Sequence, residues 1–256
     1  MPSILEDTTP RVFLARHGET EWTLNGRYTG LTDLTLTSAG ESQVLASSDA
    51  FVGPHRLIDP SKLARVLISP RRRAQQTAKL LLGEHTLKQL HGEGKVATRE
   101  EIREWQYGRY EGWLTRDIRR DRKERGLDQE REWDVWRDGC EDGEGEGEIA
   151  KGEVPSEVTA RIDQIIAEIR DFHRGGMKGE KSPVTDILLV SHGHFLRAFT
   201  KRWLGYQLDF PLTMLLEPGG IGVMSYAHHN VDEPAFLLGG LYRAPLKEEL
   251  TSTEIN

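Results

Sequence analysis

The 256-residue chain contains a single cysteine, Cys140, which excludes an internal disulfide. A lone thiol suits a reducing compartment, so we expect a cytoplasmic protein and leave the nucleus open. The chain also lacks any apolar run of the ~18 residues that a membrane-spanning helix needs. Its N-terminal segment, MPSILEDTTPR, has no basic region before an apolar stretch, so we predict neither a signal peptide nor a membrane partner.

Positive charge is not in excess either. The chain has 34 Lys and Arg against 41 Asp and Glu, a formal net charge of −7, which argues against nucleic acid as a partner. Hydrophobic residues make up 37% of the chain, enough to fill a substantial core. The length fits one large domain or two small ones, and we expect a single domain over 1–256. The composition does not decide whether the protein forms a homo-oligomer.

Short apolar runs alternate with segments of helical periodicity. The runs RVFLA (11–15), RVLIS (65–69) and TDILLVSH (185–192) predict buried strands. Helices are expected over 36–51, with Thr37 or Ser38 as the N-cap, over 71–82, and over 194–205, closed by Gly205. This alternation predicts an α/β fold with a mostly parallel sheet. Two later strands, 220–229 and 235–242, flank the turn segment NVDEP.

Two polar stretches interrupt this pattern. Residues 116–139 are densely charged with both signs interleaved, which is typical of a solvated helix face. Residues 140–153 are acidic and rich in glycine, which indicates a surface loop. We therefore expect a charged, partly helical insertion at about 100–155.

Basic residues follow three of the predicted strands. In parallel α/β sheets, ligands bind at the carboxyl ends of the strands. Three basic strand ends at one edge of a sheet predict an anion pocket, formed by Arg16 and His17, by Arg71, Arg72 and Arg73, and by His192, His194 and Arg197.

Four motifs occur in order: RHGETEW (16–22), SPRRRAQQTA (69–78), EWQYGRYEG (104–112) and SHGH (191–194). Together they resemble the histidine phosphatase superfamily, the phosphoglycerate mutase-like proteins. The resemblance implies the three-layer α/β/α fold of that family. Segments 26–40, 103–112, 133–144 and 219–230 are most similar to its fungal sugar-bisphosphatase branch.

The resemblance also implies a mechanism. His17 would be the nucleophile that becomes a phosphohistidine, while Arg16 and Arg73 bind the phosphate and His192 donates to a phosphoryl oxygen. Glu104 would be the acid/base group, with its pKa raised by the nearby phosphate dianion. Arginine and histidine supply the positive charge, so we expect no metal and no cofactor.

A sugar bisphosphate is the implied substrate, with sedoheptulose 1,7-bisphosphate the first choice. Arg197 lies five residues after His192, about one helical turn beyond the strand end, so we expect it to bind the phosphate that is not transferred. The expected substrate-binding residues are Tyr28, Thr29, Gly30, Trp105, Tyr107, Arg197 and His229.

Several residues have a second interpretation. Arg71 and Arg72 bind phosphate or are simply solvated, and Glu100, Glu101 and Glu111 are acidic rivals of Glu104. Adjacent strand residues point to opposite faces, so only one of His228 and His229 is expected to face the pocket, which also disfavours a metal site there. His194 is interpreted as structural, and Trp133 and Trp136 as core or lid packing.

The family implies rival functions as well. A phosphoglycerate mutase uses the same histidine but must keep its intermediate from water, and the acidic segment 141–153 would make a poor lid. A broad-specificity phosphatase and an inactive binding protein are further alternatives, and the intact site residues argue against the second. The chain departs from its expected relatives in two places. The segment before 219–230 is short, and the acidic loop is long.

Overall fold

The structure, a computed structural model, describes residues 9–144, 151–177 and 185–237. Its centre is a six-stranded sheet with the order β3-β2-β4-β1-β5-β6. Four of these strands are parallel, and the last two are antiparallel additions at one edge. The strands span Val12–Arg16 (β1), Leu63–Ile68 (β2), Val96–Thr98 (β3), Asp186–Ser191 (β4), Ile221–Tyr226 (β5) and Pro234–Phe236 (β6).

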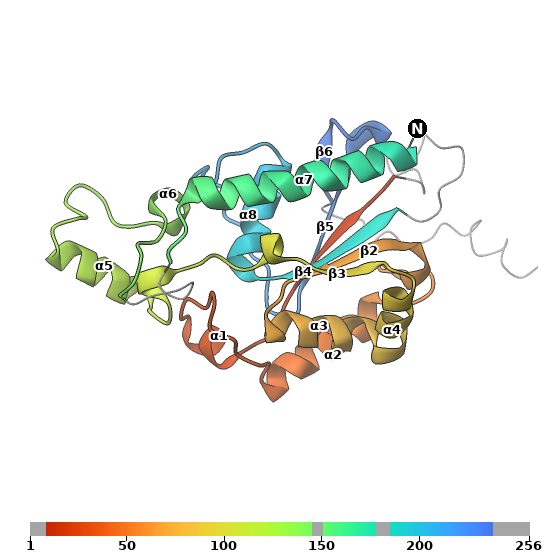
Figure 1. Ribbon diagram of the computed structural model, residues 1–256, viewed down its shortest axis with the longest axis horizontal. Coiled ribbons are helices and arrows are strands. Elements are labelled where there is room, and N and C mark those ends of the chain that lie inside the picture. The colour runs from red at the N-terminus through yellow and green to blue at the C-terminus, as the bar shows by residue number, and fades with distance from the viewer. Residues whose placement is uncertain (1–8, 145–150, 178–184, 238–256) are drawn as a thin grey trace, which may run out of the picture.

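Helices cover both faces of the sheet (Figure 1). One face carries α7 (Pro155–Met177) and α8 (Gly193–Trp203), and the other carries α2 (Ser38–Phe51), α3 (Arg72–Leu82) and α4 (Glu84–Gly92). Side chains of β1 alternate between two cores: Val12 and Leu14 pack with α7 and α8, while Phe13 and Ala15 pack with α2 and α3. The three-layer α/β/α fold with a mostly parallel sheet is therefore confirmed.

The expected elements are present with small shifts at their ends. Thr37 is the N-cap of α2, because its hydroxyl accepts the Gly40 N–H at 3.0 Å. Helix α8 begins at Gly193, one residue before the expected start, and Gly205 beyond its end has a φ of 83°. β5 and β6 form the expected antiparallel pair, and residues 238–242 of the second predicted strand lie outside the described residues.

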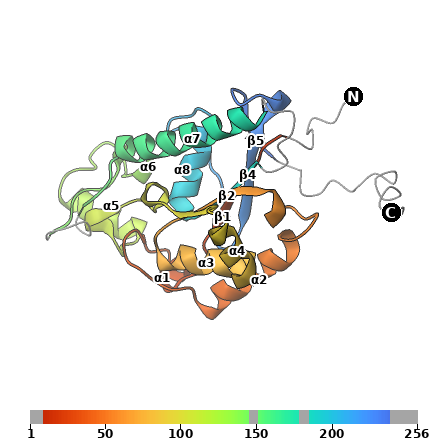
Figure 2. The same cartoon turned by 45° about the vertical axis from the view of Figure 1, so that its right-hand side comes forward.

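The charged region between β3 and α7 forms short helices. They are η2 (Glu100–Ile102), η3 (Gly108–Tyr110), α5 (Thr115–Glu124) and α6 (Val135–Asp138). Figure 2 places α5 at the same end as α1 (Glu21–Asn25). In α5 only Ile118 is buried, and Arg125 pairs with Asp121 one turn earlier, as expected of a solvated helix. Residues 145–150 of the acidic loop fall outside the described ranges.

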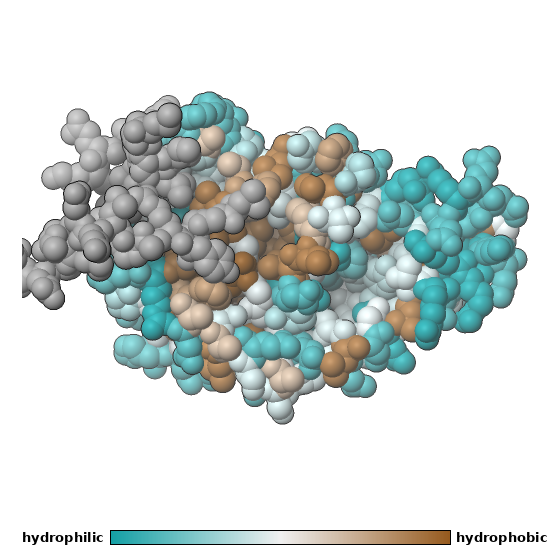
Figure 3. Space-filling model, turned by 180° about the vertical axis from the view of Figure 1, so that it is seen from behind, coloured by the Kyte–Doolittle hydropathy of each residue, from teal (hydrophilic) through white to brown (hydrophobic). Residues whose placement is uncertain are grey.

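The face seen in Figure 3, behind the view of Figure 1, carries apolar residues. Brown residues gather there in Figure 3, and a hollow of about 360 Å³ is lined by residues that include Leu212, Leu216, Val223 and Phe236. No helix within 9–144, 151–177 or 185–237 is both long and apolar enough to cross a membrane.

Candidate active site

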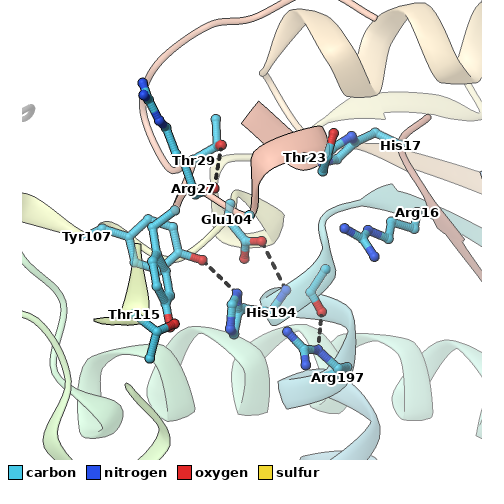
Figure 4. Close-up of a pocket in the computed structure, with 13 residues that line it drawn as sticks. Arg16, His17, Thr23, Arg27, Thr29, Glu104, Tyr107, Thr115, His194 and Arg197 are labelled. Carbon is cyan, nitrogen blue, oxygen red and sulfur yellow. Dashed lines mark hydrogen bonds between the residues drawn. The ribbon is translucent and has the colours of Figure 1, made fainter. Parts of the chain in front are cut away.

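A pocket of about 300 Å³ lies at the carboxyl ends of β1 and β4 (Figure 4). It brings together side chains that are far apart in the sequence. β1 and the residue after it contribute Arg16 and His17, and the start of α8 contributes Gly193, His194 and Arg197. The remaining wall comes from the α1 region and the insertion: Thr23, Gly26, Arg27, Tyr28, Thr29, Glu104, Tyr107 and Thr115.

His17 follows β1 directly and is held in one orientation. Its backbone N–H donates to the Ser191 carbonyl at 3.0 Å, and its Nδ1 lies 2.7 Å from the Gly18 carbonyl. A carbonyl oxygen only accepts, so Nδ1 carries the proton and Nε2 keeps its lone pair. Burial lowers the pKa of His17 well below its ordinary value and Arg73 lowers it further, while the bond to Gly18 opposes the shift. The imidazole is therefore neutral and has a nucleophilic nitrogen at neutral pH.

Arg16 is a half-buried cation beside this nucleophile. Its Nη1 donates to the Leu216 carbonyl at 2.6 Å, and its Nε has no partner within the described residues. A Cβ on Gly193 would come within 3.2 Å of the Arg16 Cζ, so glycine permits this close approach to the start of α8. The guanidinium keeps unused donors in the pocket, where an anion can accept from them.

Arg73 and His192 lie behind His17 and are not among the side chains that line the pocket. The Nε of Arg73 donates to His192 Nδ1 at 3.1 Å, so the proton on His192 is at Nε2, which lies 2.7 Å from the Ser69 hydroxyl. The His192 and His17 ring centroids are 5.1 Å apart. The structure thus brings both residues beside the nucleophile. In this arrangement their donors are bonded within the protein, and their contacts with phosphate stay predictions.

Glu104 is buried in the pocket wall, 6% exposed, against the start of α8. Its Oε1 accepts from the backbone N–H groups of Trp105 and Phe195 at 3.0 and 2.8 Å, and its Oε2 accepts from His194 at 3.0 Å. These three N–H groups hold the Glu104 side chain in one orientation against the start of α8.

The acidic rivals of Glu104 have other partners. Glu111 accepts from the backbone N–H groups of Gly30 and Thr32, and Glu101 pairs with Arg99. The best contact of Glu100 is with Arg71, at 4.0 Å. Glu104 is the one of the four that reaches the pocket.

A buried ion pair holds the segment that carries Glu104. Arg161 on α7 donates from Nε and Nη2 to the Glu153 carboxylate at 2.9 and 3.0 Å. Its Nη1 donates to the carbonyls of Glu101 and Arg103, both at 2.9 Å. The backbone just before Glu104 is thereby tied to α7.

Aromatic side chains form the wall opposite Arg16 (Figure 4). The Tyr107 hydroxyl shares a hydrogen bond with His194 Nδ1 at 2.9 Å, and the Tyr28 ring stacks on His194 at an interplanar angle of 20°. Sequence reasoning treated His194 as structural and missed Thr23, Arg27 and Thr115, all of which line the pocket. For His194 the available signal was its position in the first turn of a helix that starts at a strand end.

Two expected substrate-binding residues lie behind the wall instead. Gly30 is buried and its carbonyl accepts from Arg73 at 3.0 Å, while Thr29, its neighbour, does line the pocket. Trp105 is fully buried, and its indole N–H donates to the Glu153 carbonyl at 2.9 Å. Both residues therefore support the wall from behind rather than line it.

His228 and His229 do not face the pocket, so the expectation that one of them does is wrong. β5 runs antiparallel to β1, which brings its end beside the start of β1, at the edge opposite His17. There His229 Nδ1 lies 3.1 Å from the Thr9 hydroxyl, and His228 pairs with Glu233. Both residues have a φ of 52° in a 3₁₀ turn, so strand alternation does not apply to them.

Arg197 lines the pocket on the side of Arg16. Its Nε donates to the Gly193 carbonyl at 3.0 Å, and its positive charge contributes to a lowered pKa of Arg16, after burial as the main cause. Arg71 and Arg72 lie outside the pocket lining. Within the described ranges, no three His, Cys, Asp or Glu side chains gather as a metal site would require.

Comparisons with known proteins agree with this geometry. The sequence model of the histidine phosphatase superfamily (branch 1) matches residues 12–233. Sedoheptulose 1,7-bisphosphatase of Saccharomyces cerevisiae is 38% identical, with 97% of this chain and 98% of that protein covered. An acid phosphatase of Mycobacterium tuberculosis is 33% identical, with 85% and 87% covered.

Solved structures are similar as well. The product of the M. tuberculosis open reading frame Rv3214 superposes with a TM-score of 0.66 at 30% identity, covering 91% of this chain and 97% of that one. The mycobacterial glucosyl-3-phosphoglycerate phosphatase Rv2419c has a TM-score of 0.63 at 22% identity, covering 90% and 97%, and shares the fold. The family match and the similarity to a bisphosphatase over nearly the whole chain show that this chain is a phosphoric monoester hydrolase. It belongs to the histidine phosphatase superfamily, branch 1.

Proposed function

We propose that the chain hydrolyses a sugar bisphosphate, with sedoheptulose 1,7-bisphosphate as the first choice, through a phosphohistidine at His17. The observation that carries the proposal is the neutral His17, with Nδ1 bonded to Gly18, in a pocket that also holds Arg16, Arg197 and the Glu104 carboxylate. Similarity to the yeast sedoheptulose 1,7-bisphosphatase over nearly the whole chain supports this substrate.

The reaction has two steps. His17 Nε2 attacks phosphorus and forms the N–P bond while the P–O bond to the sugar breaks, and Arg16 stabilises the charge on the phosphoryl oxygens. Glu104, acting as the general acid, gives a proton to the leaving sugar oxygen. The resulting carboxylate then takes a proton from water, whose oxygen attacks phosphorus, so that phosphate leaves and His17 is regenerated.

Arg73 and His192 support the first step from behind His17. Arg73 orders the carbonyls of Thr29, Gly30 and Thr32 and keeps His192 in one tautomer. When phosphate binds, these two residues shift their donors towards its oxygens. Arg197 binds the phosphate that is not transferred, and Tyr28, Thr29 and Tyr107 line the space for the sugar.

A broad-specificity phosphatase is the second candidate, favoured by the 33% identity to a protein named acid phosphatase. Phosphate release from sedoheptulose 1,7-bisphosphate, fructose 1,6-bisphosphate, 3-phosphoglycerate and an aryl phosphate separates the candidates. We expect kcat/KM to be highest on sedoheptulose 1,7-bisphosphate and unchanged by a chelator. Equal values on all four would favour the second candidate, and isomerisation of phosphoglycerate without phosphate release would indicate a mutase.

A further inference from the structure

One aromatic side chain of the insertion lies directly against the pocket wall. The ring of Trp136, on α6, has its centroid 5.3 Å from the Arg197 Cζ and 5.2 Å from the His194 ring. Its ring centroid also lies 5.9 Å from that of Trp105, the neighbour of Glu104. The indole therefore packs against both segments that carry pocket residues, the start of α8 and the segment around Glu104.

Arg197 has few other restraints. Its Nε bond to Gly193 leaves both Nη groups without a hydrogen-bond partner in the described part of the chain. No carboxylate in that part lies within 4.0 Å of it, although many of the other arginines have such a partner. The Trp136 ring face is thus the main group that fixes the direction of this guanidinium.

A like charge lies one turn further along the same helix. Lys201 follows Arg197 at i+4, where two cations repel each other. The Lys201 Nζ donates to the Leu208 carbonyl at 2.6 Å and lies 4.5 Å from the Trp136 ring centroid. Lys201 is therefore held in place, so its repulsion acts on the guanidinium of Arg197. The negative face of the Trp136 indole offsets this repulsion.

We propose that Trp136 is a positioning residue for Arg197. Its ring attracts the face of the guanidinium, while the N–H groups at the guanidinium edge remain available to a phosphate oxygen of the substrate. The insertion thereby determines how well the pocket binds its anionic substrate. The identity of that substrate rests on the proposed function, whereas the contact between Trp136 and Arg197 does not.

Trp136→Leu retains an apolar side chain and removes the ring, and Trp136→Phe retains a ring. With Trp136→Leu we expect KM for sedoheptulose 1,7-bisphosphate to rise about fivefold and kcat to stay within twofold, since a partly buried cation–π contact is lost. Trp136→Phe should recover most of the binding. Phe172→Leu is the matched control: it removes a ring 4.6 Å from Arg65, outside the pocket lining, and should change neither constant.

A double-mutant cycle with Arg197→Ala decides the proposal, measured on sedoheptulose 1,7-bisphosphate and on an aryl phosphate. Once Arg197 is absent, Trp136→Leu should have no further effect on KM. The proposal would be overturned if the two substitutions raised KM by independent factors, or if Trp136→Leu and Trp136→Phe weakened binding equally. Unchanged kinetics of Arg197→Ala on both substrates would overturn it as well. A wild-type enzyme active only on the aryl phosphate would refute the proposed substrate, and the cycle would then be measured on the inhibition of aryl phosphate hydrolysis by sedoheptulose 1,7-bisphosphate.

Discussion

The pocket is built from two regions that hold their side chains in different ways. Arg16 and His17 end a buried strand, and the backbone of His17 is bonded to β4. Glu104 and Tyr107 lie in the insertion, on short turns held by the buried pair of Glu153 and Arg161. The groups proposed to meet phosphorus therefore depend on the sheet, whereas Glu104 and Tyr107 depend on polar tertiary contacts. This separation allows the two regions to be tested one at a time.

The strand-end region should show the largest effect on activity. His17→Ala removes the nucleophilic nitrogen, so we expect no measurable turnover and no acid-labile phosphoenzyme in a rapid-quench experiment. The side chain donates only to its neighbour Gly18, so thermal unfolding should stay close to that of the wild type. Turnover near the wild-type rate would refute the phosphohistidine mechanism.

In the insertion, loss of the buried ion pair should lower the free energy of unfolding. Arg161→Met leaves the Glu153 carboxylate, 3% exposed, with Arg103 as its remaining side-chain cation, and we expect a loss of 3–4 kcal/mol in urea unfolding. Since Arg161 also binds the carbonyls beside Glu104, kcat should fall too. Arg174→Met is the control, because it breaks only exposed pairs, with Asp171 and Asp232, and should cost ~0.5 kcal/mol or less. Equal effects would show that the pair does not hold the insertion.

Acid should weaken the sheet-bound core through its buried histidines. His173 donates from Nε2 to the Thr185 carbonyl and accepts from Tyr226, and burial lowers its pKa from 6.5 to about 4. Between these two values the unfolded chain binds the proton and the folded chain does not. Stability therefore falls by about 3 kcal/mol as the pH drops from 6.5 to 4.

His173→Phe should flatten this part of the stability profile, as measured by urea unfolding at several pH values. An unchanged slope in that variant would assign the acid sensitivity to other groups.

Arg197 stands where the two regions meet and should show the smallest of these effects. Arg197→Ala should lower kcat/KM on sedoheptulose 1,7-bisphosphate roughly ten- to a hundredfold, the value of a charge-assisted hydrogen bond to phosphate. A much smaller loss on an aryl phosphate is expected if Arg197 binds the phosphate that is not transferred. Equal losses on both would instead place it at the reacting phosphate beside Arg16.

Local patterns were sufficient for the sheet side of the site. The continuous burial of β1, the capping hydroxyl of Thr37 and the helix that starts at Gly193 all follow from neighbours in the chain. The placement of His228 and His229 did not follow, because the direction of β5 is set by pairing with a strand some 200 residues earlier. Trp105 and Gly30 were predicted to bind substrate, but both lie behind the pocket wall, and this placement depends on their hydrogen bonds with Glu153 and Arg73.

By itself, the sequence determined the fold class, the strand ends that meet at one edge, and His17 beside a set of cations, because these depend on local periodicity and on motifs of adjacent residues. Tertiary structure alone decided which side chains line the pocket. It buried Arg73 and His192, placed His194 in the pocket lining, and placed Trp136 against Arg197. The physical reason is that these contacts join segments distant in the chain, and their geometry follows from how the helices and the insertion pack onto the sheet.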